Sequence, residues 1–365
     1  MHAQSQGEVS CLASGQLFPE PETQSQLTVV VCTEPSQWDR YVTSKSESSN
    51  YHRWIWGEVV KWTYGHEFYR LAAMQNGTVR GVLPLCFVRS RAFGNVLISM
   101  PFFSYGGLVA DNAFIGDQLL SNAIQLARRV GAPHIEVRQG SVLPTSWVSR
   151  AHKVTMEVLL PATADELWKQ LSSGMRNKIR NAKKNGLRVE WRGSEGVETF
   201  YRIFSTNMRN LGTPVYPRSW FANICSSMPE ETRFVTVWDG KEPVASGIVT
   251  SFRDAVELPW SGSLPESRKK YSAVLMYWSV LEWALINGYR RVDLGRCTPG
   301  GGTYEFKRHF GCVESPLHWY HWVAQGSIPE TSPDNPRYRL ATRIWRRLPV
   351  AIANQLGPLI VRSTP

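Results

Sequence analysis

The chain has 365 residues, of which 42% are hydrophobic and 12% aromatic, and its formal net charge is +11. This length is long for one hydrophobic core and sufficient for two domains, and the composition excludes a mainly disordered chain. The positive charge favours polyanionic partners such as nucleic acid, anionic lipid, nucleotide-linked sugars or CoA-like donors, without selecting one of them.

The cysteines and the N-terminus indicate a cellular compartment. The six cysteines form no C-x-x-C pair and have no zinc-type spacing with histidine, so we expect reduced thiols and no metal site. The N-terminus lacks the pattern of a signal peptide, and no run reaches the ~18 apolar residues that span a bilayer. We therefore expect a cytoplasmic protein, with a peripheral position at the inner membrane left open.

The first 160 residues predict a tail and then an α/β unit. Residues 1–26 are rich in Gln, Ser, Glu and Pro without a hydrophobic period, which is typical of a mobile tail. The segment 27–160 follows as a first domain. It has a helix over 53–65, a hairpin over 68–88 that turns at Asn76-Gly77, a strand over 95–102, a helix over 116–131 and a strand over 134–138.

The same order recurs in residues 161–325. A helix over 197–212 precedes a hairpin over 233–252, a strand over 255–262, a helix over 272–290 and a strand over 291–295. A helix-hairpin-strand-helix-strand unit used twice predicts an α/β fold of two similar domains, each a mixed sheet with helices on its faces.

A helical segment leads into the second unit. Thr163 with Glu166 fits a capping box, residues 172–174 interrupt the helix, and residues 185–186 end it. In its second part, Arg176 and Arg180 share a face with two lysines beside an apolar stripe. These cations form either a phosphate-binding edge, for which arginine offers a bidentate fork, or a solvated helix face.

The C-terminal residues 326–365 form a basic extension. Five arginines alternate with apolar residues and no acid between Arg337 and Arg347. A basic amphipathic helix of this kind can lie on an anionic membrane, and the alternative is that it packs on the protein and solvates its arginines.

The glycine-rich stretch Asp293 to Gly311 is the main candidate for chemistry. It matches neither the Walker nor the dinucleotide-binding pattern, but it follows the carboxyl end of a strand, where open α/β sheets usually bind ligands. We expect a short helix over 304–310 with Thr303 as its N-cap. Lys307 would then polarise a reacting carbonyl while Glu305 or His309 moves a proton; alternatively Phe306 and Phe310 bury the helix and Lys307 faces water. A nucleophilic Cys297 is disfavoured, because nothing nearby lowers the pKa of its thiol.

With these residues in view, the chain resembles the FemAB family of acyltransferases, most closely the branch associated with PEP-CTERM/exosortase exopolysaccharide systems. The resemblance extends from about Tyr51 to the C-terminus and rests on "GVLPL", "MPFFSYGGL", "MRNKIRNAKKNGL", "NMRNLGTPVYP", "LMYWSVLEWA", "DLGR-TPG-GTYEFK--FG" and the "NP-YR…W-RLP…N-LGP" tail. It implies tandem GNAT-like domains that join an amino acid from aminoacyl-tRNA to the amine of an envelope precursor.

The resemblance also implies roles for particular residues. Lys307 matches the lysine of the family's F-K-x-x-[FW]-G element, which is thought to polarise the acyl carbonyl. The substrate-binding positions that we infer are Arg176, Arg180, Arg296, Tyr304, Asn207, Thr213 and Tyr216. Departures at Cys297, Gly301, His309-Phe310 and Cys312 leave the donor and acceptor open.

The donor is an acyl compound used as a co-substrate, and we expect no resident cofactor. The pyrophosphate loop [RQ]-x-x-G-x-[GA] of acetyl-CoA enzymes is absent before the helix at 272, although Arg268, Lys269 and Lys270 offer charge for a donor phosphate. Three hypotheses follow: an N-acyltransferase that uses aminoacyl-tRNA or another acyl carrier on an envelope or saccharide precursor, an acetyl-CoA-dependent enzyme with a divergent loop, and a non-catalytic basic module for RNA or anionic membrane.

Overall fold

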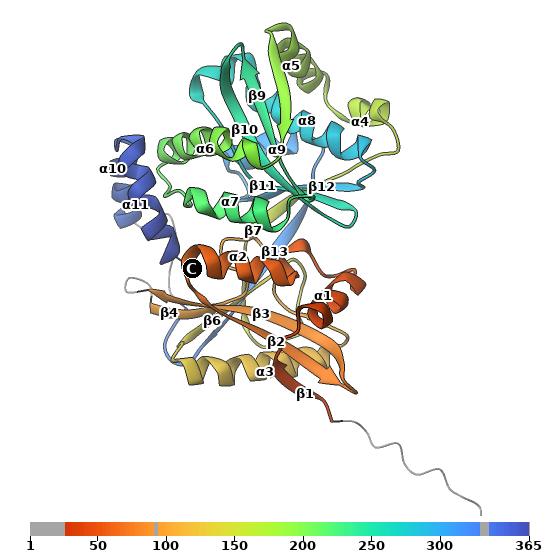
Figure 1. Cartoon of the computed structure of the whole chain (residues 1–365), viewed down its shortest axis with the longest axis vertical. Helices are drawn as coiled ribbons and strands as arrows, with labels where there is room; N and C mark the ends of the chain where they lie inside the picture. The colour runs from red at the N-terminus through yellow and green to blue at the C-terminus, as the bar shows by residue number, and fades with distance from the viewer. Residues whose placement is uncertain (1–25, 91–93, 329–335, 365) are drawn as a thin grey trace, which may run out of the picture.

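Figure 1 shows a computed structural model, which describes residues 26–90, 94–328 and 336–364, without the side chains of 336–339. The predicted mobile tail, except Gln26, and the side chains of Arg337 and Arg339 lie outside the described residues. No helix in the described part of the chain has the length and apolar character that crossing a membrane requires. The described cysteines, which omit Cys11, are free thiols.

The first half contains the predicted elements and adds several. Its elements are β1 (Thr28–Val31), α1 (Pro35–Ser44), α2 (Trp54–Tyr64), β2 (Glu67–Gln75), β3 (Thr78–Ser90), β4 (Gly94–Ile98), β5 (Val109–Ala110), α3 (Ala113–Val130), β6 (His134–Gln139) and β7 (Val148–Leu159). The predicted helices, hairpin and strands are confirmed, but β4 ends at Ile98 because Met100 and Phe102 have positive φ angles of 45° and 75°. An extended strand cannot continue through left-handed backbone.

The second half repeats this order. Its elements are α4 (Ala164–Gln170), α5 (Ser173–Lys184), β8 (Leu187–Arg192), α6 (Val197–Leu211), α7 (Arg218–Ser227), β9 (Thr232–Asp239), β10 (Glu242–Phe252), β11 (Ala255–Ser263), α8 (Ser272–Ile286), β12 (Arg291–Cys297), α9 (Gly302–Arg308) and β13 (Val313–Val323). The capping box of Thr163 and Glu166 is confirmed. Thr303 is not the N-cap of α9: the turn in which the Gly301 N–H donates to the Thr298 carbonyl starts this helix earlier, at Gly302.

The strands of both halves join into one sheet. In the described residues it has 13 strands, with the order β1-β2-β3-β4-β6-β13-β7-β12-β11-β10-β9-β8 and β5 beside β3. Both halves use the same pairings, since β4 lies parallel to β6 and β11 lies parallel to β12. The last strand of each half is exchanged: β7 pairs with β12 and β13 pairs with β6. The fold is therefore α/β, a large mixed sheet flanked by helices.

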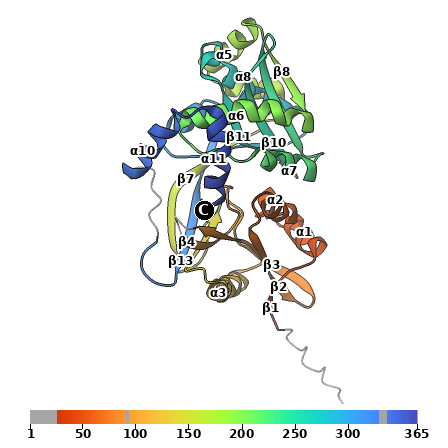
Figure 2. The same cartoon turned by 60° about the vertical axis from the view of Figure 1, so that its left-hand side comes forward.

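Four hydrophobic cores occur in the described residues, and the three largest hold this arrangement together. One lies between α8 and the second half of the sheet, another between α3 and the first half, and the third is an aromatic core between the halves. In this third core, Phe103 of the first half meets Trp220 and Trp260 of the second at ring-centroid distances of 5.8 Å. Figure 1 shows α2 and α7 facing each other across this junction. The last two helices are α10 (Pro336–Trp345) and α11 (Val350–Arg362); α11 contacts α6, and Figure 2 shows α10 on the same side of the molecule.

Candidate active site

The end of β12 has an irregular backbone that creates a polar site. Gly295 has a φ angle of +81°, which a residue without Cβ adopts at low cost, and its N–H donates to Oδ1 of Asp293 at 2.7 Å. The pairing of β12 with β7 shifts register between Asp293 and Arg296. The bulge turns the Gly295 carbonyl away from the ladder, where it accepts a hydrogen bond from Lys307 at 2.9 Å.

Lys307 on α9 is buried, with 4% of its surface exposed. Its ammonium donates to the Gly295 carbonyl, and no carboxylate of the described residues forms an ion pair with it. Buried charges in proteins are normally paired, so this cation with donors to spare is unusual. The alternative that Lys307 faces bulk water does not fit this burial.

Lys307 lines a cavity of about 270 Å³ between the halves, which we call the lysine cavity. The first half contributes Tyr51 and residues 102–104, and the second contributes α6, β11, β12 and α9. Four residues singled out from the sequence meet in its wall, namely Lys307, Arg296, Asn207 and Tyr216. Residues 207–216, at the end of α6 and just after it, therefore form one site with the glycine-rich stretch.

The other sequence candidates lie elsewhere. Glu305 and His309 are exposed, and Glu305 pairs with Arg308 at 3.5 Å. Neither they nor Tyr304 and Thr213 line the lysine cavity. A role for Glu305 or His309 in moving a proton at this cavity is therefore not supported by their positions.

The two basic segments also lie outside the cavity. Arg180 is exposed and stacks on Trp168 at 5.3 Å, and Arg176 is half-buried on the same helix, at the end of the second half far from the first (Figure 1). Arg268 and Lys269 are exposed, and Lys270 pairs with Asp239 at 2.6 Å. These cations remain predicted phosphate contacts on the surface.

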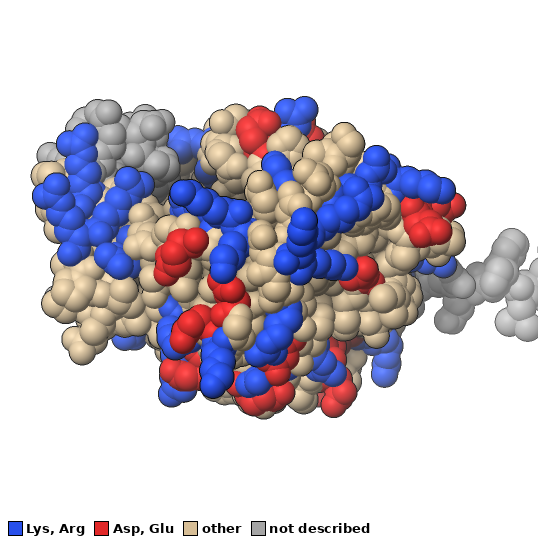
Figure 3. Space-filling view, turned by 90° about the horizontal axis from the view of Figure 1, so that it is seen from above, with Lys and Arg blue, Asp and Glu red and all other residues tan. Residues whose placement is uncertain are grey.

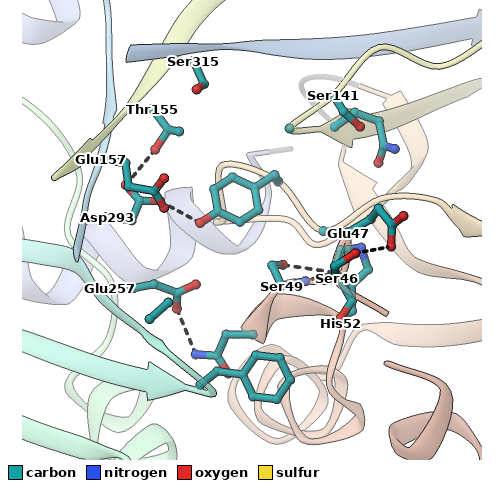
Figure 4. Close-up of a pocket in the computed structure, with 18 of the residues that line it drawn as sticks. Ser46, Glu47, Ser49, His52, Ser141, Thr155, Glu157, Glu257, Asp293 and Ser315 are labelled. Atoms are coloured by element: carbon teal, nitrogen blue, oxygen red, sulfur yellow. Dashed lines mark hydrogen bonds between the residues drawn. The ribbon is translucent and has the colours of Figure 1, made fainter. Parts of the chain in front are cut away.

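A second cavity of about 300 Å³ adjoins the first, and Glu257 and Asp293 line both. We call it the acidic cavity, because Glu47 and Glu157 line it as well, together with Arg253 and Arg291. Figure 4 shows Glu157, Glu257 and Asp293 side by side on neighbouring strands, and Asp293 is the register partner of both glutamates. The carboxylates thus form a row across β11, β12 and β7.

Asp293 and Glu257 differ in how fully they are bonded. Asp293 accepts hydrogen bonds from Thr155, the Gly295 N–H and the Tyr105 hydroxyl at 2.6–2.7 Å, so both of its oxygens are used. Glu257 accepts from Asn50 at 2.9 Å and from Thr250 at 3.2 Å, both at Oε2, and the Tyr51 hydroxyl also bonds to this carboxyl group. Asp293 is therefore held at both oxygens by three donors, whereas the donors to Glu257 include two side chains of the first half, Asn50 and Tyr51.

Burial raises the pKa of Glu257 to about 7; hydrogen bonds from Asn50, Thr250 and Tyr51 oppose this rise, and the charge of Asp293 adds to it. A carboxyl group with a pKa near neutrality can take up and release a proton under physiological conditions, which is the property of a general base. Sequence reasoning missed Glu257. The available signal was a single carboxylate inside the otherwise apolar strand "AVELPW".

Arg296 belongs to a cluster at the far wall of the lysine cavity. It donates to the Phe103 carbonyl at 3.4 Å and lies 5.5 Å from the ring centre of Trp319, which Arg138 approaches from 4.3 Å. Arg138 forms an ion pair with Glu136 at 2.7 Å. The indole of Trp319, which contacts both guanidinium groups, thus helps to hold the Arg296 side chain in the cavity wall.

Among the described residues, His134, Glu136 and His321 come close enough together to hold a metal ion. The two imidazoles are 3.0 Å apart, which a hydrogen bond accounts for, and the Arg138 guanidinium already pairs with Glu136. We interpret this cluster as a hydrogen-bonded support for Arg138.

Comparisons with known proteins define the class of fold. Residues 169–308 match the family described as an acetyltransferase (GNAT) domain. FemX is similar in structure, with a TM-score of 0.63 and 16% identity, over 86% of this chain and all of that one. A proposed lysylphosphatidylglycerol synthetase domain (C-terminal, DUF2156) from Agrobacterium fabrum has a TM-score of 0.55 and 13% identity, over 80% of this chain and 91% of that one.

A tandem GNAT protein from the clavulanic acid biosynthesis pathway has a TM-score of 0.54 and 12% identity, over 83% of this chain and all of that one. No curated protein matches the sequence. The chain therefore contains a GNAT-type acetyltransferase domain in its second half and has the fold of FemX, a FemAB-family protein, over most of its length.

Proposed function

We propose that this chain is an N-acyltransferase that forms an amide between an acyl or aminoacyl donor and an amine of a cell-envelope or exopolysaccharide precursor. The observation that carries the proposal is that the lysine cavity places a buried, carboxylate-free ammonium, Lys307, and a carboxyl group with a pKa near 7, Glu257, in one wall. Amide formation needs both an oxyanion stabiliser and a proton acceptor.

The reaction follows from these two groups. A neutral amine attacks the carbonyl carbon of an ester or thioester, a C–N bond forms, and the carbonyl oxygen becomes an oxyanion that the Lys307 ammonium stabilises. Glu257 accepts the proton that the nitrogen loses. The C–O or C–S bond then breaks, and the leaving group takes up a proton as the amide is released.

The two cavities suggest which substrate enters where. An amine reaches the site as an ammonium ion, which the carboxylates of the acidic cavity attract, whereas the lysine cavity with Arg296 suits the electron-rich end of the donor. Since Glu257 lines both cavities, it stands between the two substrates. The ammonium loses one proton to water before attack, and Glu257 accepts the second proton, which the nitrogen loses as the C–N bond forms.

The first test is Lys307→Ala. Loss of one oxyanion donor should lower kcat by ~10²-fold or more without unfolding the chain. Arg308→Ala on the same short helix, where the side chain is exposed, is the matched control and should retain wild-type turnover. Equal turnover of wild type and Lys307→Ala would exclude the proposed role.

The identity of the donor is a separate part of the proposal. We favour aminoacyl-tRNA or another acyl carrier, because the segment before α8 lacks the glycine pattern of a pyrophosphate loop. Melting temperatures measured with acyl-CoAs, charged tRNA and nucleotide sugars would identify the donor, since a ligand selective for the folded state raises stability by mass action.

The match to an acetyltransferase domain supports acetyl-CoA as the second candidate donor. In that case acetyl-CoA binds saturably, and neutralising Arg268, Lys269 and Lys270 abolishes the binding. A basic module without catalytic activity would instead bind polyanions with a steep salt dependence and transfer no acyl group from any of these donors.

A further inference from the structure

The helices α10 and α11 present an apolar surface that no described residue covers. Six large aliphatic side chains on them are between 42% and 65% exposed, and we call them the C-terminal face: Leu340, Ile344, Ile352, Leu356, Leu359 and Ile360. Leu340 and Ile344 are four residues apart on α10, and on α11 Leu356 is four residues from Ile352, three from Leu359 and four from Ile360, so each helix carries its exposed side chains in one stripe. Scattered apolar side chains are normal on a protein surface, but two consecutive stripes indicate a docking site.

The opposite sides of both helices are fixed to the second half. Trp345 and Ala353 are buried, and a Cβ built on Gly357 would lie 2.8 and 2.9 Å from the backbone N and O of Val215. Arg346 donates to the Leu211 carbonyl at 3.3 Å. These contacts fix which sides of α10 and α11 face the protein. The exposed stripes therefore lie on the sides that face away from it.

The same surface is cationic. Arg343 in α10 and Arg347 just after it are each three residues beyond a side chain of the stripe, Leu340 and Ile344 respectively, and both arginines are exposed. The sequence from Pro336 to Pro365 contains no acidic residue. Figure 3 shows blue side chains gathered at the left end of the molecule, which is the side of α10 and α11 in Figure 1.

The combination of cations with aliphatic side chains distinguishes between polyanions. A bilayer that contains anionic lipid offers phosphates to the arginines and an apolar layer to the stripes. Single-stranded nucleic acid binds basic surfaces through aromatic side chains on which bases stack, and the exposed large apolar side chains described on α10 and α11 are all aliphatic. The chemistry of this surface therefore fits a membrane better than RNA.

We propose that the C-terminal face docks this chain on an anionic bilayer, with α10 and α11 lying in the interface. At 13 residues, α11 is shorter than the ~20 residues that span a hydrocarbon core, so the helices lie on the membrane without crossing it. This inference does not depend on the proposed acyl transfer, since it rests on the helices alone.

Docking also orients the lysine cavity. Leu211, whose carbonyl Arg346 contacts, is 51% exposed and lines this cavity together with Asn207 and Met208. The exposed Leu211 side chain thus lies between the segment after α10 and the cavity wall at the end of α6, so docking places the cavity near the bilayer surface.

The test is flotation of the purified full-length chain with vesicles of phosphatidylcholine containing about one third phosphatidylglycerol, compared with phosphatidylcholine alone. The wild type should float with the anionic vesicles only. Ile344→Asn with Leu356→Asn should weaken binding by about 10-fold or more. Arg343→Gln with Arg347→Gln should weaken it by about 30-fold at low salt, and less at high salt.

Matched controls lie on other surfaces. Phe114→Asn on α3, where the phenyl ring is 62% exposed, removes an equally exposed apolar group, and Lys183→Gln with Lys184→Gln on α5 removes two exposed cations. Both should bind vesicles like the wild type. Circular dichroism and the melting temperature check folding, which exposed substitutions should preserve.

Three results would overturn the proposal. The first is wild-type protein that stays with the unbound fraction, or controls that lose as much binding as the face variants. The second is a dimer in light scattering that dissociates in Ile344→Asn with Leu356→Asn, which would make a second copy the occupant. The third is tight binding of a single-stranded RNA, weakened by Arg343→Gln with Arg347→Gln, without flotation.

Discussion

Glu257 provides a prediction about pH. The carboxyl group must be deprotonated to accept the amine proton, and its pKa is raised to about 7 by burial. Acyl transfer should therefore rise with pH through about 7 and then level off. Glu257→Gln should lower kcat by ~10²-fold or more and remove this step from the profile of kcat against pH. An unchanged step in the variant would assign the titration to another group.

The same residue should show the opposite effect on stability. Its pKa is higher in the folded chain, about 7, than the ordinary value of 4.5, so ionisation opposes folding. The stability associated with protonated Glu257 is complete below the unfolded pKa and is lost as pH rises to about 7. Glu257→Gln should therefore raise the free energy of unfolding relative to wild type at pH 8, by up to ~3 kcal/mol. Urea unfolding at pH 4 and pH 8 measures it, and a variant less stable than wild type at pH 8 would contradict it.

A substitution at Gly295 tests whether the backbone at the β12 bulge positions the Lys307 side chain. A Cβ at Gly295 would strain the left-handed backbone at a φ of +81° and would lie 3.5 Å from the Leu258 carbonyl and 3.7 Å from Lys307 Nζ. Gly295→Ala should cost ~1–2 kcal/mol of stability and lower kcat by ~10-fold. Gly300→Ala is the control, because that glycine has a φ of +75° in open space. It should share the loss of stability but retain wild-type kcat; equal kcat values for the two variants would exclude a positioning role.

At the scale of elements, local patterns predicted most of the fold. The hairpins at Asn76-Gly77 and Asp239-Gly240 and the long helices have periods that one sequence segment carries by itself. The strands β7 and β13 were missed, because both are partly exposed and β13 contains Pro316. Their exchange between the halves is a long-range pairing, which no local pattern records.

The candidate site was also predictable only where a local motif carries it. Lys307 was found because it stands in a local motif, and it lies in the lysine cavity. Glu257 was missed because its burial and its hydrogen bond from Asn50 come from the other half of the molecule. A carboxylate acquires such a pKa only when distant segments meet, so the sequence of β11 alone does not reveal it.

The position of α11 depends on the absence of a side chain at Gly357. A Cβ there would lie 2.8 Å from the Val215 backbone, and Val215 precedes Tyr216 of the lysine cavity. Gly357→Ala should therefore lower the free energy of unfolding by ~1–3 kcal/mol despite the better helix propensity of alanine. Gly174→Ala in α5, where nothing lies within 4 Å, should instead be neutral or stabilising. Urea unfolding of both variants measures these changes in the free energy of unfolding. Stabilisation by Gly357→Ala would show that α11 can move away freely.

For the whole molecule, the exchanged strands and the aromatic core predict that the halves unfold together. Each half includes a strand of the other, and Phe103 packs against Trp220 and Trp260 across the junction. Phe103→Leu should therefore weaken both halves, although the substitution lies in one, by about 1–2 kcal/mol. Native-state hydrogen exchange measures this loss of stability from the protection of buried amides in α3 and α8, which belong to the cores of different halves.

A substitution inside one half tests the same cooperativity. Leu120→Ala, a change in the core of the first half, should lower the protection of both helices equally if unfolding is one cooperative step. Protection lost in α3 alone would show that the first half unfolds while the second stays folded, which would contradict a single cooperative step.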